Sequence, residues 1–285
     1  MGLQGVDAFS PGLLLITIHQ PRDQYLNQPC STQEKNTEEI HSKSSTAILG
    51  ATGTIGRALA RRLVRHGHEV LLVGRNEEKL RSLSEELGQP FVAVDLTSSA
   101  PLEQALREVA AARGGMHALV NCIGSILLKP ADATTDDEFR QVVEANLFTA
   151  FATIRVGAKL LRDRGGTIIL FASAAAEIGL KNHEAIAAAK AGVIGLARSA
   201  AATYAANNIR VNVVSPGLVR SELTRRIWEN SASAAASAQM HALGRLGEPE
   251  HVASLAYWLL EAENDWITGQ VIGIDGGLGH VVPRR

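Results

Sequence analysis

This chain of 285 residues lacks several features that would place it in a specialised class of protein. Its two cysteines, Cys30 and Cys122, form neither a disulfide framework nor a metal-binding pattern. The formal net charge is −1, so no overall basic field attracts nucleic acid or an anionic membrane. No apolar run approaches the roughly 20 residues that span a bilayer, and no basic segment precedes the apolar residues 13–16. We therefore expect a cytoplasmic protein that uses no metal, nucleic acid or membrane.

Apolar residues are abundant, at 46% of the chain, although aromatic residues make up only 4%. This amount of apolar material suits one α/β domain with a large core. Residues 1–44 show no sustained periodicity and are polar from His19 onward, so we interpret them as a largely disordered N-terminal extension. Residues 45–285 are interpreted as the folded domain.

Regular alternation of two kinds of segment predicts the fold of this domain. Short apolar runs, typical of buried parallel strands, occupy 46–50, 69–73, 91–94, 117–120, 167–171, 209–214 and 271–274. Segments with helical periodicity lie between them, at 55–66, 77–87, 101–113, 135–162, 184–206 and 249–261. The sequence therefore predicts a single α/β domain with a doubly wound Rossmann-type fold, in which helices cover both faces of a seven-stranded parallel sheet.

A glycine-rich turn follows the first predicted strand and opens the first predicted helix. Glycines at this spacing let the backbone approach a pyrophosphate, which then lies at the positive end of the helix. We expect a dinucleotide cofactor to bind at the turn through Gly50, Thr52, Gly53, Thr54, Ile55 and Gly56.

Residues at the ends of the later strands indicate which cofactor binds. A Rossmann site for NAD carries an acidic residue after the second strand, but here that strand is followed by Arg75. A guanidinium at this place pairs with a 2′-phosphate, which favours NADP over NAD. Asp95 and Leu96 end the third strand, where an acid can accept a hydrogen bond from the adenine amine. Asn121 ends the fourth strand, where its amide can brace the cofactor loop.

The order of these and later motifs resembles the short-chain dehydrogenase/reductase family from Thr46 to about Gly277. The matching segments beyond the glycine turn are Asn121-Cys122-Ile123-Gly124, Glu144-Ala145-Asn146-Leu147, Ser173, Lys190, 210–217, 267–270 and 275–277. Leu49 and Thr54 differ from the residues usual in the family. The resemblance implies further cofactor contacts from Gly124, Lys190, Pro216, Gly217, Val219 and Ser221.

The resemblance also implies a catalytic group of Asn, Ser, Tyr and Lys, of which this chain offers Asn146, Ser173 and Lys190. In the family the tyrosine protonates the substrate oxygen as hydride reaches carbon. The lysine lowers the pKa of that tyrosine and binds the nicotinamide ribose, while the serine hydrogen-bonds the carbonyl. Here Ile186, four residues before Lys190, takes the tyrosine position. Isoleucine carries no proton, and losing a general acid costs about 10²–10⁴ in rate.

Three hypotheses follow from Ile186. In the first, His183 donates the proton, because imidazolium is a competent donor near neutral pH, and Glu184 is a further candidate. In the second, the substrate needs no strong acid, as with an iminium or a conjugated enone. In the third, the protein binds NADP(H) without catalysis and has a regulatory or structural role. A lyase or isomerase on the same scaffold also stays open.

We favour an NADP(H)-dependent oxidoreductase that acts on a C=O, C=N or activated C=C bond of a small apolar substrate. Its proton donor is non-standard, with His183 as the first candidate. Residues 218–247 correspond in the family to a lid over the substrate, where Trp228 and Met240 can line an apolar wall. The resemblance also implies a homo-oligomer, either a tetramer or a dimer, built through the helices at 135–162 and 184–206 and the C-terminal strand.

Overall fold

The computed structural model describes residues 45–282 and contains the seven-stranded parallel sheet that the sequence predicts. The strand order is β3-β2-β1-β4-β5-β6-β7, so the chain changes its winding direction between β1 and β4. The predicted extension, residues 1–44, lies outside the described residues. The strands are β1 (Ser45–Leu49), β2 (Glu69–Gly74), β3 (Phe91–Ala93), β4 (Ala118–Asn121), β5 (Gly166–Phe171), β6 (Ile209–Pro216) and β7 (Val271–Ile274).

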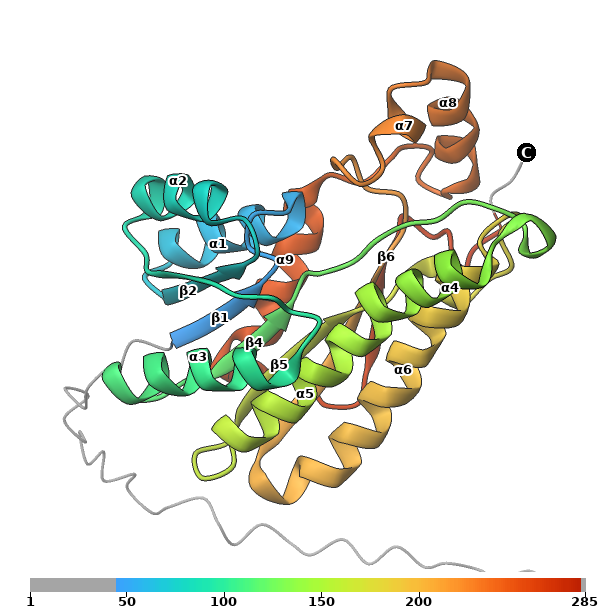
Figure 1. Ribbon diagram of the computed structural model, residues 1–285. Helices are drawn as coiled ribbons and strands as arrows, with labels where there is room; N and C mark the ends of the chain where they lie inside the picture. Colours follow the sequence, from blue (N-terminus) through green and yellow to red (C-terminus); the bar gives the residue numbers. More distant parts are fainter. Residues whose placement is uncertain (1–44, 283–285) are drawn as a thin grey trace, which may run out of the picture. The chain divides into compact units, whose positions relative to one another are not determined.

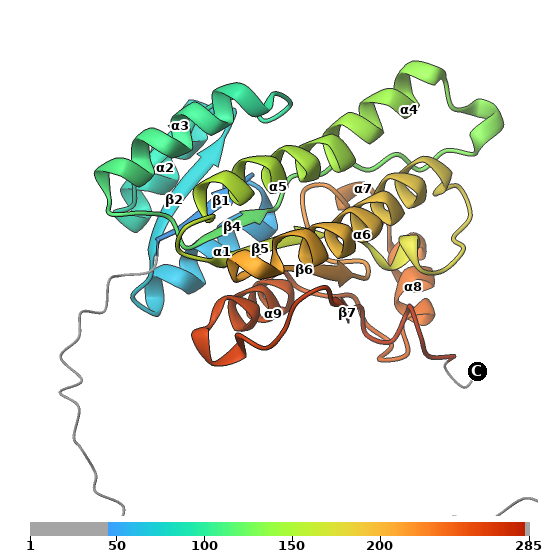
Figure 2. The ribbon, with the colours of Figure 1, turned by 90° about the horizontal axis from the view of Figure 1, so that it is seen from below.

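Helices cover both faces of the sheet (Figure 1). On one face lie α1 (Thr54–Arg65), α2 (Glu77–Leu87) and α9 (Pro249–Leu260). On the other face lie α3 (Ser99–Ala112), α4 (Asp136–Val143), α5 (Thr149–Leu160) and α6 (Glu184–Tyr204). The view from below separates the layers, with α3, α5 and α6 on one side of the strands and α9 on the other (Figure 2). The doubly wound Rossmann-type fold is thereby confirmed.

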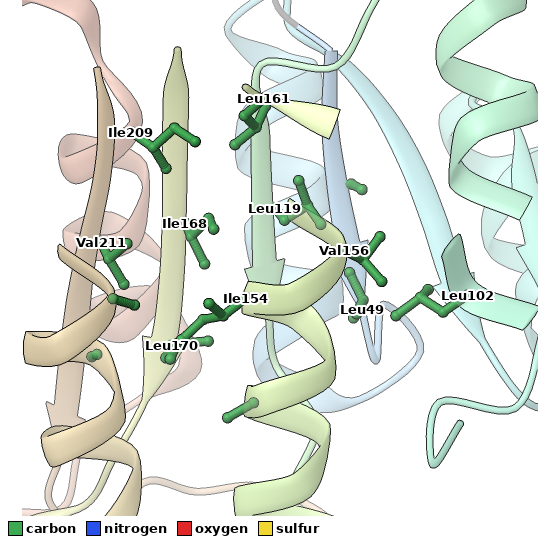
Figure 3. Packing of buried hydrophobic residues seen from close by; sticks show 14 of the residues in the cluster. Leu49, Leu102, Leu119, Ile154, Val156, Leu161, Ile168, Leu170, Ile209 and Val211 are labelled. Atoms are coloured by element: carbon green, nitrogen blue, oxygen red, sulfur yellow. The ribbon is translucent and has the colours of Figure 1, made fainter. Parts of the chain in front are cut away.

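Two apolar clusters hold these layers together. The larger one fills the space between the sheet and α3, α5 and α6 (Figure 3). There Ile154 and Val156 of α5 pack with Leu119, Ile168 and Leu170, which are on the central strands. These side chains are at most 4% exposed, and burying each one contributes about 1.5–3 kcal/mol relative to leaving it in water. This packing fixes α5 and α6, and with them the residues that reach the carboxyl edge of the sheet.

The predicted helix at 135–162 is interrupted. It begins at a capping box, in which Thr135 Oγ1 accepts from the Glu138 amide and Glu138 accepts from the Thr135 amide. Between α4 and α5 the chain forms a π-helical turn (η2, Glu144–Phe148), a widened turn of the kind often found at functional sites. Helical periodicity does not reveal such a turn, because it adds only one residue to the repeat. Its buried side chain is Asn146.

The predicted lid at 218–247 contains two helices that the sequence analysis does not predict, α7 (Arg225–Trp228) and α8 (Ser231–Met240). The Ala- and Ser-rich composition of α8 gives it no apolar stripe, so periodicity could not reveal it.

Within the described residues one helical stretch, 184–207, is long and apolar enough to cross a membrane. That stretch is α6 and the short turn after it, and 44% of its apolar window is buried inside the protein. This helix packs against β5 and β6 of the sheet, so part of its apolar surface belongs to the protein core.

Candidate functional site

The candidate site lies at the carboxyl edge of the sheet, where the winding direction changes between β1 and β4. Parallel sheets of this kind bind ligands outside the carboxyl ends of their strands at such a point. Gly50 follows β1, Asn121 ends β4, Ser173 follows β5 and Pro216 ends β6. The fold therefore brings four of the predicted site segments to one edge.

The turn from β1 into α1 permits a close approach of backbone to backbone. Gly50 has a φ of +80°, a left-handed conformation that glycine adopts without strain. A Cβ atom on Gly56 would lie 2.4 Å from the Gly50 carbonyl oxygen, so only glycine allows α1 to start this near the strand. The first turn of α1 carries no acidic residue, so its positive end accepts an anion such as a pyrophosphate.

Arg75 and Asp95 follow β2 and β3 and are both exposed. Hydrogen bonds from the amide and the hydroxyl of Thr97 lower the pKa of Asp95, and the charge of Arg75 lowers it further. Because the two charges interact, Arg75 and Asp95 lie near each other at the carboxyl edge of the sheet. The side chain of Leu96, in contrast, is buried in the core, so only its backbone could contact a cofactor.

Asn121 and Asn146 organise the loop that follows β4. Asn121 Oδ1 accepts from the Ile123 amide at 2.9 Å, which braces that loop. Asn146 Nδ2 donates to Ser125 Oγ at 3.0 Å and to the Val142 carbonyl at 2.9 Å. Asn146 lies in the π-helical turn, and its side chain joins that turn to the loop after β4.

Lys190 projects from α6 into the same region. A Cβ atom on Gly124 would lie 3.1 Å from Asn146 Oδ1 and 3.6 Å from Lys190 Nζ, so these groups surround one point. The Lys190 ammonium donates to the Phe171 carbonyl at 2.8 Å, and its side chain is buried. Burial lowers the pKa of Lys190 to about 8, so the ammonium form still predominates at neutral pH.

Ser173 begins a short 3₁₀ turn after β5 (η3, Ala174–Ala176). Its hydroxyl accepts from the Ala175 amide at 3.2 Å, which holds the side chain in place. Ile186 lies one turn before Lys190 on α6 and is 4% exposed. It packs with Val142 of α4 and with Leu127 from the loop after β4. Next to Lys190 the site therefore has an apolar wall.

His183 precedes the first residue of α6, two turns before Lys190. Its Nδ1 lies 2.7 Å from the Lys181 carbonyl oxygen. With the proton on Nδ1 for this bond, Nε2 of a neutral ring is an acceptor, and only the imidazolium form donates from Nε2. His183 is thus held at the start of α6 and stays a candidate donor. Glu184, the further candidate, is exposed in the first turn of α6.

The tyrosines of the described region lie away from Lys190. Tyr204 is at the far end of α6, roughly 20 Å along the helix at 1.5 Å per residue. Tyr257 belongs to α9 on the opposite face of the sheet, where its ring lies 4.7 Å from that of His66. Tyr25 is outside the described residues. The region 45–282 therefore places no tyrosine hydroxyl beside Lys190.

The loop after β6 carries the last predicted cofactor contacts. Pro216 and Gly217 lie at the carboxyl edge, as expected for a turn that faces the cofactor. The side chain of Val219 is buried in the core, so only its backbone is available. The hydroxyl of Ser221 lies 3.0 Å from Thr224 Oγ1 inside the lid.

Thr54 links this lid to the glycine turn, because its hydroxyl accepts from the Glu222 amide at 3.2 Å. No local pattern predicts this contact, which joins residues 168 positions apart.

Sequence reasoning also missed His241. This residue is 3% exposed, and its Nε2 accepts from the Leu218 amide at 3.1 Å, which fixes the loop after Pro216. No motif or periodicity links position 241 to that loop. Among residues 45–282 no group of three or more His, Cys, Asp or Glu side chains is placed to hold a metal ion.

A doubly wound parallel sheet with a glycine turn at its switch point defines the class of dinucleotide-binding α/β proteins. A family model described as enoyl-(acyl carrier protein) reductase matches residues 50–279, and the chain belongs to the short-chain dehydrogenase/reductase family. It is an oxidoreductase of that type.

Similar proteins agree with this assignment. Carbonyl reductase family member 4 of Xenopus laevis is 32% identical over 238 residues, which cover 81% of this chain and 96% of that protein. A short-chain type dehydrogenase/reductase from Mycobacterium ulcerans has a TM-score of 0.80 at 30% identity, covering 83% of this chain and 90% of that one. A tyrosine-to-phenylalanine variant of ElxO with NADPH bound has a TM-score of 0.78 at 25% identity, covering 83% and 98%.

Proposed function

We propose that this oxidoreductase uses NADP(H) and acts on a C=O, C=N or activated C=C bond of a small apolar substrate with a non-standard proton donor. The observation that carries the proposal is the environment of Lys190. Its buried ammonium stands beside Asn146 and Gly124, while Ile186 replaces the hydroxyl-bearing side chain expected one turn earlier. The groups proposed to bind the cofactor are therefore present. The difference from the catalytic group that the family resemblance implies is the missing general acid at position 186.

Arg75 supports NADP over NAD. It is exposed at the end of β2, where a 2′-phosphate of a bound dinucleotide would lie, and no acidic residue stands there to bind a free ribose hydroxyl. The NADPH-bound ElxO variant shows that a protein of similar fold binds this cofactor. When bound, NADPH would supply the hydride, and the residues of this chain would position the substrate.

Calorimetric titration with NADPH and NADH tests the cofactor. We expect tighter binding of NADPH, and Arg75→Ala should weaken NADPH at least tenfold while leaving NADH nearly unchanged. Lys79→Ala, which changes an exposed cation in the first turn of α2, is the matched control. Equal affinity for both cofactors in the unmodified protein would contradict the proposal.

A panel of ketones, iminium ions and enones tests the chemistry. We expect turnover of at least one member with NADPH. The variant His183→Ala tests whether His183 is the proton donor. Loss of activity in the variant, together with a histidine-like pH profile of the unmodified protein, supports this role. Unchanged activity excludes it. Tight NADPH binding without hydride transfer to any member would instead indicate a protein that binds the cofactor but does not catalyse its oxidation.

We also propose that the protein is a homo-oligomer built on α4, α5 and α6, which lie side by side on one face (Figures 1 and 2). Phe139, Phe148 and Phe151 are each more than 40% exposed on that surface. Light scattering after gel filtration should give a dimer or tetramer. Replacing both Phe148 and Phe151 by Ser should shift the protein toward the monomer, whereas Trp266→Ser, at a site that is 97% exposed elsewhere, should not.

A further inference from the structure

Glu177 is a carboxylate close to Ser173 that the proposed function does not use. It ends the short turn η3, four residues after Ser173. One of its oxygens accepts a hydrogen bond from Ser215 Oγ. Ser215 follows Val214, whose partner in β5 is Phe171, and Ser173 comes two residues after Phe171. Glu177 therefore lies over the carboxyl ends of β5 and β6, where the substrate side of the site begins.

The alternation of side chains along β6 shows on which face this carboxylate lies. Val211 and Val213 pack in the cluster beneath α5 and α6, whereas Val214 packs in the opposite cluster. Successive strand residues point to opposite faces, so Ser215 faces the α6 side of the sheet. That is the side of Lys190 and Ile186. The carboxylate held by Ser215 thus shares a face with the apolar wall of the site.

Few groups that can carry a positive charge lie near the carboxylate of Glu177. Its second carboxylate oxygen lies 3.6 Å from His280 Nε2, and the side chain of His280 is 70% exposed. The side chain of Glu177 is only 22% exposed. The ammonium of Lys190 is directed at the Phe171 carbonyl. Glu177 as a whole is an exposed residue, and within residues 45–282 the recorded ion-pair partner of its carboxylate is the exposed His280. A ligand cation that approaches this carboxylate therefore meets little competing positive charge.

We propose that the substrate carries a cationic C=N bond, an iminium, and that Glu177 is the specificity-determining residue that binds its charge. This inference rests on the oxidoreductase function proposed above. It joins two features of one site, an anionic side chain and an apolar wall at Ile186, which together suit an apolar organic cation.

Reduction of an iminium also agrees with Ile186. As a hydride from the reduced nicotinamide dinucleotide forms the new C–H bond, the electron pair of the C=N bond becomes a lone pair on nitrogen. The substrate becomes a neutral amine and the cofactor is oxidised, with no proton taken from the protein in that step. A ketone, in contrast, needs a proton on its oxygen, which isoleucine does not supply.

The test compares a permanent cation, N-methyl-dihydroisoquinolinium, with a neutral ketone of similar shape, tetralone. We expect the unmodified protein with NADPH to prefer the cation, and Glu177→Gln to lower kcat/KM for the cation at least tenfold without lowering it for tetralone. Ser215→Ala removes the hydrogen bond but keeps the charge, so it should keep the preference for the cation. His280→Ala removes the imidazole next to the Glu177 carboxylate and should maintain or strengthen that preference.

Binding supplies a second readout that is independent of turnover. With NADP⁺ present, calorimetry should show that the unmodified protein binds the N-methyl-tetrahydroisoquinolinium ion at least tenfold more tightly than Glu177→Gln does. Neutral tetralin should bind both proteins equally. An equal loss for cation and neutral compound in Glu177→Gln would show that Glu177 only braces the loop, and the inference would fail.

Failure of the inference differs from failure of the proposed function. If tetralone is reduced and the cation is not preferred, the proposed role of Glu177 is wrong. The proposed function as an NADP(H)-dependent oxidoreductase would still hold. Absence of NADPH binding would overturn the proposed function itself. If NADPH binds and neither compound is reduced, the calorimetric comparison alone decides, because it measures the interaction of Glu177 with the charge directly.

Discussion

The cofactor side and the substrate side of this site are built in different ways. At the glycine turn the functional groups are backbone atoms, and the steric demand of Gly56 against Gly50 leaves almost no freedom of sequence. On the substrate side the groups are side chains from α6, η3 and the lid. Ile186 is confined only by the side chains of Val142 and Leu127, and His183 and Glu177 face no backbone contact of the kind found at Gly56. The geometry of the glycine turn is therefore fixed by the fold, whereas side chains on the proposed substrate side can change by single substitutions.

Ile186→Tyr should produce the largest change, because it adds the missing acid one turn from Lys190. A general acid contributes about 10²–10⁴ in rate, or roughly 3–5 kcal/mol of barrier, so we expect carbonyl reductase activity to appear on generic ketones. Steady-state oxidation of NADPH measures it.

Ile186→Phe is the matched control for that change, since it introduces a ring of similar size without the hydroxyl. It should crowd Leu127 and Val142 equally but gain no activity on ketones. Equal behaviour of the two variants would mean that the substrate side has diverged at more positions than Ile186.

The titration of Lys190 should give the next largest effect. Burial lowers its pKa from 10.5 to about 8, so between these values the unfolded chain holds a proton that the native protein lacks. Raising the pH through this window therefore stabilises the native state, by about 3 kcal/mol for a shift of this size. Urea unfolding of the protein and of Lys190→Met from pH 7 to 10 measures the difference, in which other titrating groups cancel.

The unmodified protein should gain stability relative to Lys190→Met as the pH rises through about 8. A difference that stays constant with pH would show that Lys190 keeps its ordinary pKa. Cofactor affinity should move in the opposite direction, because the ammonium that would hold the ribose loses its proton over the same range.

These two regions also differ in how well the sequence predicts them. The strands, the glycine turn and the place of Asn121 follow from periodicity and spacing, because each depends on neighbours along the chain. Ser173 and Lys190 are expected from the family resemblance. The π-helical turn around Asn146 does not, since widening one turn leaves the apolar pattern almost unchanged.

The partners of Thr54 and Glu177 could not be predicted either. Their contacts, with Glu222 and Ser215, join segments that are 168 and 38 residues apart and that meet only after the sheet has formed. No local pattern of residues predicts these two hydrogen bonds, which can be identified only from the three-dimensional structure.

Gly56→Ala tests the rigidity of the cofactor side and should cost about 1–3 kcal/mol of stability, the usual range for overpacking. Its Cβ atom would meet the Gly50 carbonyl oxygen at 2.4 Å, so α1 must shift and the turn must open. Thermal unfolding measures the loss, and NADPH affinity should fall with it.

Gly195→Ala is the matched control, because Gly195 is also helical but has open space around it. There we expect a gain of about 0.5–1 kcal/mol from helix propensity, and a similar loss at both glycines would contradict the steric explanation.

Thr54→Ala tests the hydrogen bond that joins the two regions and should have the smallest effect. Removing the acceptor frees the Glu222 amide, at a cost near the 0.5–1.5 kcal/mol of a typical hydrogen bond, so the lid should open more often. The fluorescence of Trp228 can measure the opening of the lid, since its indole donates to the Ser221 carbonyl at 2.8 Å inside the same lid.

With Trp258 and Trp266 replaced by Phe, quenching of Trp228 fluorescence by acrylamide should increase in Thr54→Ala. Thr54→Ser keeps the hydroxyl and should behave like the unmodified protein. If quenching is the same in all three, the lid is held by its own internal contacts, and the cofactor turn and the lid move independently.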